Sequence, residues 1–235
     1  METLKLTKQD FDVKNKYIGK IDVSDYQGHI EIEAGLGWVF FAKIKITGYL
    51  WAKAGTGIEA GEGIEAGWGI KAGTGIEAGE GIKAGEGIEA GEGIEAGWGI
   101  KAGEGIEAGE GIEAGTGIEA GWGIEAGWGI EAGTGIEAGW GIEAGWGIEA
   151  GWGIEAGWGI KAGWGIEAGW GIISGLFISC NKVLKFSLRV FAGVCWWRKL
   201  QSDEEKTITC GRLEGGEVCY GIVKEIGIKE ATAKS

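Results

Sequence analysis

Apolar and polar residues alternate with a fixed period of six along the middle of the chain. From Ile58 to Gly171 the sequence is nineteen consecutive hexads of the form I-[EK]-A-G-[EWT]-G. Ile and Ala lie two positions apart with a charged residue between them, which is the alternation of a strand and not of a helix. The pattern therefore predicts short β-strands with Ile and Ala inward. Gly-x-Gly is expected at a corner, where glycine can adopt the positive φ angles of a tight bend.

A short period repeated this often is typical of a solenoid, in which each unit contacts mainly its neighbours. Along the fifth hexad position from Thr56 to Trp170, identical residues recur in 10 of 17 pairs at a lag of three hexads, against 7 of 18 at two and 8 of 16 at four. This favours coils of three hexads, or 18 residues. The register predicts four stacks along the axis: Thr56 with Thr74, Glu62 with Glu80, Thr116 with Thr134, and Trp122 with Trp140 and Trp158.

The period and the inward aliphatic residue resemble the hexapeptide-repeat family, whose members form left-handed β-helices, over most of Ile32 to Gly171. The resemblance implies an all-β, single-stranded β-solenoid with about three hexads per coil. The chain departs from the family at the corner, where Trp replaces a small inward residue, so handedness and coil shape stay open. The array is also similar to GIEAGW arrays in uncharacterised proteins of bacteria and their phages.

A second architecture keeps strict alternation in long flat strands and buries the tryptophans. It is less favoured, because Glu, Thr and Trp exchange at one position, and a solvated corner accepts such a mixture more readily than a packed core does.

The flanks of the array predict caps of irregular β-structure. Residues 1–51 are expected to form an N-terminal β cap with the first irregular coils, 52–171 the glycine-rich solenoid, and 172–235 a β-rich C-terminal cap. IEAGLG at 32–37 already matches the repeat, and AKAGTG at 52–57 is a variant hexad. The last zone loses the period, and its segment TITCGRLEGGEVCYGIVKEIGI resembles a β-hairpin.

Acidic residues are concentrated in the array. Its second position holds fifteen glutamates and four lysines, and its fifth position adds six glutamates, so the array carries 21 acids and 4 bases although the whole chain has a net charge of −13. Like charges stacked in a β ladder destabilise it. The acidic ladders allow two interpretations: a solvated β face whose charge prevents aggregation, which is the more favoured, and a surface selected for binding.

Acidic and aromatic residues of the fifth position are the candidate partner-binding residues. They comprise glutamates for basic partners and tryptophans for apolar contact, namely Glu62, Glu80, Glu86, Glu92, Glu104, Glu110, Trp122, Trp128, Trp140, Trp146, Trp158 and Trp164.

Catalysis, cofactors and metals find no support in the sequence. The single histidine, His29, has no partner motif, and the four cysteines are separated by 15, 15 and 9 residues without a CxxC pair, which favours reduced, partly buried thiols. We expect no catalytic, metal or cofactor site. The chain contains neither twenty consecutive apolar residues nor a signal-peptide pattern, so we expect a cytoplasmic protein of a bacterial host with no membrane contact.

Two functions are compatible with this surface. The first is a nucleic-acid mimic whose acidic ladders occupy the basic groove of a nucleic-acid-binding protein or complex, as expected of phage anti-defence proteins, including anti-CRISPR inhibitors. The second is a structural β-rod that forms a homo-oligomer through its tryptophans. We expect no direct binding of nucleic acid by the array. Basic residues of the tail could contact nucleic acid or form a solvated cap face, namely Lys182, Lys185, Arg189, Arg198 and Lys199.

Overall fold

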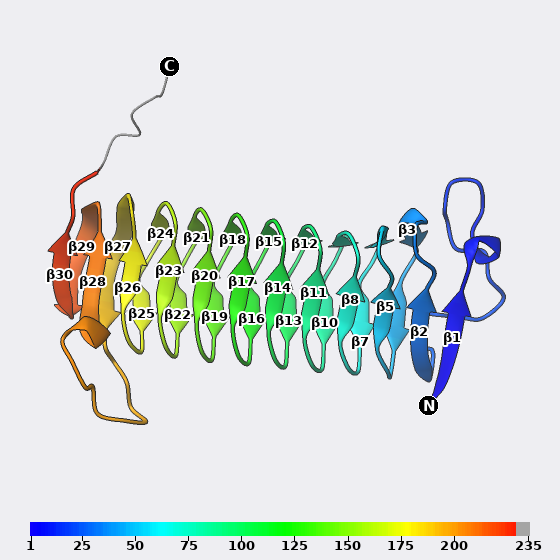
Figure 1. Ribbon diagram of the computed structural model, residues 1–235, viewed down its shortest axis with the longest axis horizontal. Helices are drawn as coiled ribbons and strands as arrows, with labels where there is room; N and C mark the ends of the chain where they lie inside the picture. The colour runs from blue at the N-terminus through cyan, green and yellow to red at the C-terminus, as the bar shows by residue number, and fades with distance from the viewer. Residues whose placement is uncertain (229–235) are drawn as a thin grey trace, which may run out of the picture.

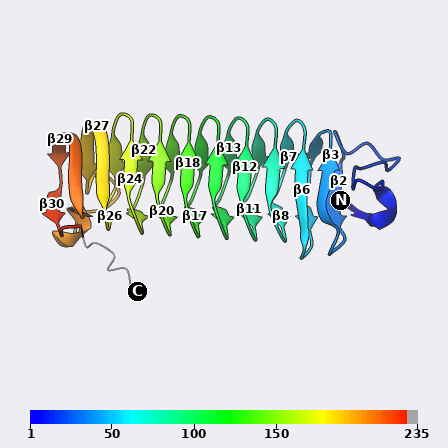
Figure 2. The same cartoon turned by 90° about the horizontal axis from the view of Figure 1, so that it is seen from above.

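The structure, a computed structural model, describes residues 1–228 and is a rod of stacked coils with β1 at one end and β30 at the other (Figures 1 and 2). All pairings between its named strands are parallel, and successive coils stack in a constant register. The expected all-β solenoid with three hexads per coil is therefore confirmed. Its three flat sides, which we call walls A, B and C, follow one another in that order along the chain.

Each wall is a ladder of strands contributed by successive coils. Wall A comprises β3 (Gly37–Phe41), β6 (Thr56–Ala60), β9 (Ile76–Ala78), β12 (Ile94–Ala96), β15 (Ile112–Ala114), β18 (Ile130–Ala132), β21 (Ile148–Ala150) and β24 (Ile166–Ala168). Wall B comprises β4 (Ile44–Ile46), β7 (Ile64–Ala66), β10 (Ile82–Ala84), β13 (Ile100–Ala102), β16 (Ile118–Ala120), β19 (Ile136–Ala138), β22 (Ile154–Ala156) and β25 (Ile172–Ser174).

Wall C extends from one end of the rod to the other. It comprises β1 (Glu2–Leu6), β2 (Gly28–Ile32), β5 (Leu50–Ala52), β8 (Ile70–Ala72), β11 (Ile88–Ala90), β14 (Ile106–Ala108), β17 (Ile124–Ala126), β20 (Ile142–Ala144), β23 (Ile160–Ala162), β26 (Ile178–Cys180), β28 (Thr207–Cys210) and β30 (Ile222–Glu225). The long strands β27 (Val183–Ala192) and β29 (Arg212–Tyr220) continue both walls A and B. Two short 3-10 helices, η1 (Lys8–Asp10) and η2 (Glu204–Lys206), lie outside the walls.

The core is built from the first and third residue of every hexad. Each array isoleucine is at most 1% exposed and each array alanine at most 6%. Isoleucine stacks on isoleucine and alanine on alanine 18 residues away, as in Ile94 on Ile76. Burying one such aliphatic side chain stabilises the fold by roughly 1.5–3 kcal/mol. The four stacks expected along the fifth position are confirmed, because each later member donates its backbone N–H to the carbonyl of the earlier one.

The expected reason for the array glycines is wrong. None of those from Gly61 to Gly171 adopts a positive φ. The fourth-position glycines from Gly67 to Gly169 are needed for space, because a Cβ on any of them would lie 1.9 to 2.5 Å from backbone of the preceding coil. The corners are therefore places where two backbones approach closely, and no left-handed bend is required.

The two hexads expected before Ile58 are out of register. Ile32 occupies the alanine position of its coil, opposite Ala52, and does not begin a repeat. Ala52 in turn ends β5, so the corner between Ala52 and Ile58 holds five residues where the array has three. The extra length is taken up by Gly55 at φ 73° and by Thr56, whose hydroxyl donates to the Glu33 carbonyl at 2.8 Å.

The tail also differs from the expectation. The hexad geometry continues past Gly171, since Leu184 stacks on Ile166 and Val190 on Ile172 although the glycines are gone. The expected hairpin is wrong, because β28 and β30 pair in parallel on wall C and β29 pairs in parallel with β27. The segment Glu214-Gly215-Gly216, which was expected to form the hairpin turn, lies within β29. Its two glycines pack closely against the backbone of β27 at the place where β29 passes from wall A to wall B.

Candidate binding surface

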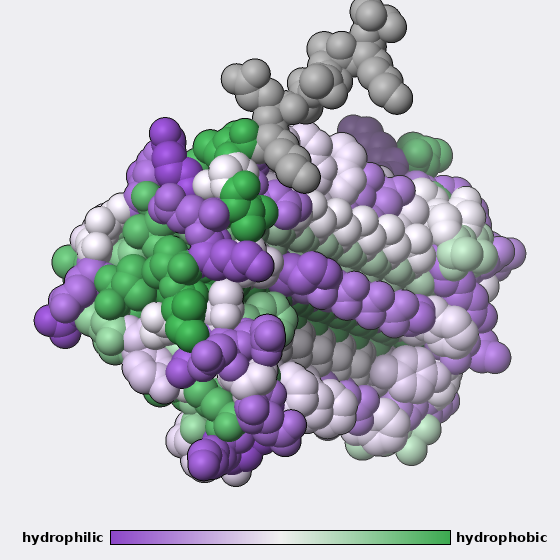
Figure 3. Space-filling model, turned by 60° about the vertical axis from the view of Figure 1, so that its left-hand side comes forward, coloured by the Kyte–Doolittle hydropathy of each residue, from purple (hydrophilic) through white to green (hydrophobic). Residues whose placement is uncertain are grey.

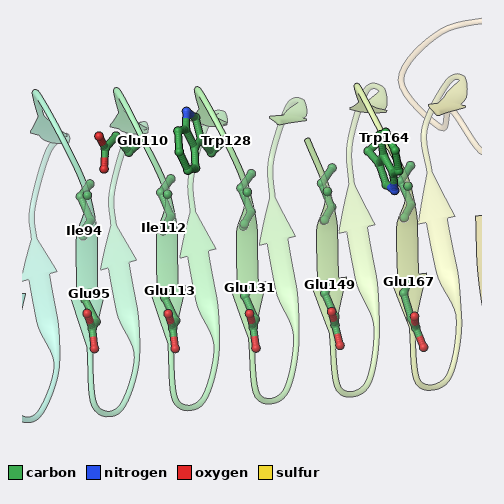
Figure 4. Close-up of a pocket in the computed structure, with 18 of the residues that line it drawn as sticks. Ile94, Glu95, Glu110, Ile112, Glu113, Trp128, Glu131, Glu149, Trp164 and Glu167 are labelled. Atoms are coloured by element: carbon green, nitrogen blue, oxygen red, sulfur yellow. The ribbon is translucent and has the colours of Figure 1, made fainter. Parts of the chain in front are cut away.

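The outward second position of each hexad forms one column of side chains per wall. On wall A the column is glutamate in seven successive coils, and it begins beyond Phe40 and ends at Lys185. Its members are Glu59, Glu77, Glu95, Glu113, Glu131, Glu149 and Glu167. Figure 4 shows the part of the column from Glu95 to Glu167. All four lysines of the array lie on the other two walls, at Lys71 and Lys161 on wall C and Lys83 and Lys101 on wall B.

Lysines neutralise walls B and C locally. Lys71 contacts Glu89 at 2.6 Å, Lys161 contacts Glu143 at 2.6 Å, and Lys101 contacts Glu119 at 2.5 Å. On wall A only the terminal Glu167 is paired, with Lys185. Among residues 1–228, none of the other six carboxylates of this column has a lysine or arginine within 4.0 Å. Wall A therefore carries the longest run of stacked carboxylates in the array, and no lysine interrupts it.

Burial and charge stacking together affect the ionisation of Glu77. Partial burial, and then the neighbouring carboxylates of Glu59 and Glu95, raise the pKa of Glu77 above its ordinary value. The ionised form is thus disfavoured in the folded chain, as expected when like charges are held one coil apart in a partly desolvated site.

The fifth position forms a second set of columns, at the three corners. The array tryptophans are 41% to 64% exposed there, so the architecture that buries them is wrong. Rings in successive coils stack: the centroids of Trp140 and Trp158 lie 5.2 Å apart with 4° between the planes, and those of Trp152 and Trp170 lie 5.2 Å apart with 5°. Each ladder presents ring edges to solvent, because the ring faces lie against each other.

A shallow groove runs along wall A beside the corner that precedes it (Figure 4). Its volume is about 730 Å³, its floor is made by isoleucine and glycine, and one side is the glutamate column. The other side is acidic in its first half, at Glu92 and Glu110, and aromatic in its second half, at Trp128 and Trp164. At the far end of the groove the ammonium group of Lys182 lies 4.9 Å from the Trp164 ring centroid.

The twelve candidate residues do not form one site. The six glutamates are divided in pairs among the three corners, and only Glu92 and Glu110 border the groove on wall A. Glu62 contacts Lys43 at 3.4 Å. The six tryptophans form two ladders on different corners, one of Trp122, Trp140 and Trp158 and one of Trp128, Trp146 and Trp164. That these residues bind a partner stays a prediction.

The glutamate column of wall A is the feature that the residue-level prediction missed. The signal is present in the sequence: Lys71 and Lys161 are a multiple of 18 apart, as are Lys83 and Lys101, so the lysines fill two of the three coil registers. The third register holds glutamate alone. Applying the 18-residue period to the second position, as well as to the fifth, would have identified it.

The remaining reactive side chains serve the fold. His29 accepts the Tyr49 backbone N–H on Nδ1 at 3.0 Å, and the two rings stack with centroids 4.2 Å apart. Burial raises the pKa of the Cys180 thiol to about 12 and that of Cys210 to about 11. Within residues 1–228, no group of three or more His, Cys, Asp or Glu side chains is arranged to hold a metal ion.

Basic residues of the tail are engaged by carboxylates of the same chain. Arg198 forms a bidentate contact with Glu205 at 2.8 and 2.9 Å, and Arg189 lies 3.9 Å from Glu217. Lys185 is likewise paired with Glu167. These intramolecular ion pairs favour the interpretation of the basic residues as a solvated cap face over a contact with nucleic acid.

No helix in the described part of the chain is long and apolar enough to cross a membrane. Comparison with known proteins gives no relative: no protein-family model, no curated protein and no solved structure matches the chain.

Proposed function

We propose that the chain is a non-enzymatic acidic binding protein that imitates a nucleic-acid backbone. Wall A, with its uninterrupted column of seven glutamates, would occupy the basic groove of a nucleic-acid-binding protein or complex. An inhibitor of a host defence system that handles nucleic acid, in the manner of an anti-CRISPR protein, is the specific form of this proposal.

The charge density of the column supports the comparison. Parallel strands stack about 4.8 Å apart, so wall A carries one carboxylate per roughly 4.8 Å of axis. One strand of B-form DNA carries one phosphate per about 3.4 Å. A single wall thus reaches about 0.7 of the linear charge of a DNA strand, on a rigid β-sheet that needs no ordering when it binds.

The distribution of lysine supports a binding role over simple solubility. Lysine at the second position relieves the stacked charge on walls B and C, and the backbone register there is the same as on wall A. Lysine would therefore fit wall A equally well. A surface that needed only to be hydrated would gain from that relief on all three walls.

The test compares two variants with the same net charge. The first replaces four carboxylates of wall A: Glu95→Gln, Glu113→Gln, Glu131→Gln and Glu149→Gln. The control replaces four unpaired carboxylates of walls B and C in the same I-E-A context: Glu107→Gln, Glu125→Gln, Glu137→Gln and Glu155→Gln. Each tagged protein is incubated with bacterial lysate, and the bound proteins are eluted by raising the salt from about 50 to 200 mM or by adding duplex DNA.

We expect the unaltered chain and the control variant to retain a basic nucleic-acid-binding protein that both salt and duplex DNA release, and the wall A variant to lose it. Equal loss of binding in the two variants would show that binding depends on net charge and not on the glutamate column of wall A. Retention of no basic nucleic-acid-binding protein by the unaltered chain would refute the mimic.

The exposed tryptophan ladders favour a second function, that of a self-assembling structural rod. Contiguous apolar ridges on a soluble surface commonly mark association sites, and Trp128 is 64% exposed within its ladder. This function predicts an oligomer that dissociates on dilution, is indifferent to salt, and is weakened by Trp128→Ser and Trp146→Ser together. Sedimentation of that double variant at several concentrations would test it.

A further inference from the structure

The last coil of the rod lacks a cover among the described residues. The outer edge of β30 has no strand beside it in residues 1–228, and Val223, which stacks on the fully buried Ile208, is itself 40% exposed. Ile222, Ile226 and Tyr220 are 40%, 46% and 46% exposed around it. Figure 3 brings this end forward and shows hydrophobic side chains gathered on it. An exposed strand edge with apolar neighbours is a template for pairing with another chain.

The opposite end of the rod is covered on walls A and B. On wall C its outermost strand, β1, has only β2 beside it in residues 1–228. Residues 7–27 wind over the first regular coil, and their side chains Phe11 and Val23 are buried there, each 5% exposed. Phe11 packs edge-on against Phe41 with centroids 5.7 Å apart. Residues 7–27 also extend past β1 along the rod axis (Figure 1), so a second rod stacked in the same direction would meet them. Residues 1–228 form no such projection past β30, and a contact through the two C-terminal ends closes after two copies.

The charges of the last coil allow two copies to meet there. β30 carries Lys224 and Glu225, one of each sign, whereas the array has a net charge of −17 and would repel a second array placed beside it. Contact between C-terminal ends keeps the two acidic arrays as far apart as the rods permit, and this reduces their mutual repulsion.

We infer that two copies of this chain dimerise through their C-terminal ends, with β30 of one pairing antiparallel to β30 of the other about a two-fold axis through wall C. Ile226 donates its N–H toward β28, to the Cys210 carbonyl at 2.8 Å. Because backbone N–H groups alternate sides along a strand, those of Val223 and Glu225 point to the free edge. The new ladder is centred on Val223, and the interface uses neither the glutamates of wall A nor the tryptophan ladders.

This register is the one that the side chains allow. Centred on Val223, it places the two valines together on the core side, Ile222 against the aliphatic stem of Lys224, and Glu225 opposite Gly221. A register centred on Lys224 would place the two ammonium groups opposite each other and Val223 against Glu225, which is unfavourable. The Glu225 carboxylate also accepts the Leu213 N–H at 3.1 Å, which holds it away from the strand edge.

The first test is the mass of the full chain measured by sedimentation equilibrium over a range of concentrations. We expect a reversible species of twice the 24.6 kDa chain mass, and at least a tenfold weaker dimer in Val223→Asp. The control is Val13→Asp, which adds the same charge at the N-terminal end where Val13 is 98% exposed, and which should leave the dimer unchanged. A single mass of 24.6 kDa at every concentration overturns the inference.

The second test fixes the register and does not depend on the stability of Val223→Asp. Val223→Cys is combined with Cys195→Ser and Cys219→Ser, and the protein is oxidised. Cα atoms of a hydrogen-bonded antiparallel pair lie about 5.5 Å apart, within the range that a disulfide spans. We expect a covalent dimer from Val223→Cys and none from Val13→Cys in the same background.

Two further outcomes identify other contacts. A dimer that persists in Val223→Asp but is lost in the Trp128→Ser, Trp146→Ser double variant would place the interface on the ladders and overturn the inference. A chain that is monomeric at full length but dimeric after removal of residues 229–235 would show that its own terminus occupies the end, and this also overturns it. Neither result bears on the lysate test of wall A, so the two proposals fail separately.

Discussion

Alanine at Gly109 should destabilise the solenoid strongly, whereas alanine two residues later, at Gly111, should not. A Cβ on Gly109 would lie 2.1 Å from the carbonyl oxygen of Gly91 and 3.0 Å from its carbonyl carbon. At Gly111 the closest atom, the carbonyl oxygen of Gly129, would lie at 3.5 Å, which is ordinary van der Waals contact. Both glycines flank Glu110, and neither has a positive φ, so the two substitutions differ in the space available and neither requires a left-handed backbone.

The destabilisation expected from Gly109→Ala can be worked out from the backbone movement that the added Cβ requires. Relieving the contact requires the corner to separate from the preceding coil by about 1 Å, which breaks the hydrogen bonds from Gly109 N–H to Ala90 at 3.1 Å and from Glu110 N–H to Glu92 at 3.2 Å. Two backbone hydrogen bonds and the lost packing amount to about 2–4 kcal/mol. Gly111→Ala needs no movement and restricts the unfolded chain, so it should be neutral or stabilise by up to about 1 kcal/mol.

Urea unfolding of both variants, followed by circular dichroism and fitted with a shared slope, measures the difference. Because repeat proteins can unfold in parts, the transition should be recorded by tryptophan fluorescence as well, and the two signals should coincide before free energies are compared. Equal destabilisation by the two variants would refute the steric explanation, and it would indicate that both glycines are required for some conformational reason absent from this structure.

Three further outcomes are expected from charge, stacking and burial. Because the pKa of Glu77 is raised in the folded chain, its protonation favours folding: this contribution is complete below the ordinary glutamate pKa of about 4.3 and is lost as the pH rises through the raised value. Glu77→Gln should therefore stabilise the chain at pH 7, by up to about 1 kcal/mol, and thermal melts should show the advantage vanishing on acidification. Trp140→Leu interrupts a ladder at its middle ring, so it should lower stability by about 1–3 kcal/mol and reduce the near-ultraviolet circular dichroism of the coupled indoles. Cys180 and Cys210, with pKa values raised to about 12 and 11 by burial, should resist alkylation at pH 8 until the chain is unfolded, as mass spectrometry of the labelled protein would reveal.

Each of these outcomes has a matched control in the same chain. Glu89→Gln removes the partner of Lys71 and should give no gain at pH 7, so an equal gain there would refute the like-charge argument. Trp98, 62% exposed, has no tryptophan stacked on it in the described residues, and Trp98→Leu should leave the dichroism unchanged. Cys195 is partly exposed and should be labelled in the folded chain, and labelling of Cys180 at the same rate would contradict the burial argument.

Residue spacing alone predicted the architecture, because the position of each residue within the hexad determines whether it faces the core, the solvent or a corner. Ile and Ala two positions apart specify an inward-facing strand, and the lag of three hexads in the fifth position specifies the coil length. Spacing did not predict the structure of the segments on either side of the array, where the strand register or the corner sequence changes. The corner before Ile58 has five residues instead of three, so the strands before it are out of phase with the hexad repeat. IEAGLG therefore matches the repeat in sequence, but Ile32 occupies the position of an alanine. In the tail, Leu184 and Val190 keep the inward positions after the glycines have gone.

The binding surface was predicted less well, because a site on a solenoid is defined across coils. The fifth-position glutamates attract attention as departures from tryptophan, yet they are dispersed over three corners. The column of wall A is made of glutamate, the commonest residue of the second position, and only the absence of lysine from one of the three coil registers reveals it. The composition gives the number of acidic residues, but it does not show that seven of them form a single column on one wall.

The same geometry explains how such a surface can change without loss of the fold. The inward Ile and Ala, together with the fourth-position glycine, are fixed by packing and by the approach of successive backbones. The second and fifth positions face solvent, and Glu, Lys, Trp and Thr are all accommodated there with the backbone register unchanged. A substitution at the second position therefore costs the fold only its local charge energy, within about 1 kcal/mol, and one at the fifth position costs more only where it interrupts a tryptophan ladder. An uninterrupted acidic column persists through seven coils under this weak structural constraint, although burial and then like-charge repulsion raise the pKa of Glu77 within it, and this supports the proposal that the column binds a basic partner.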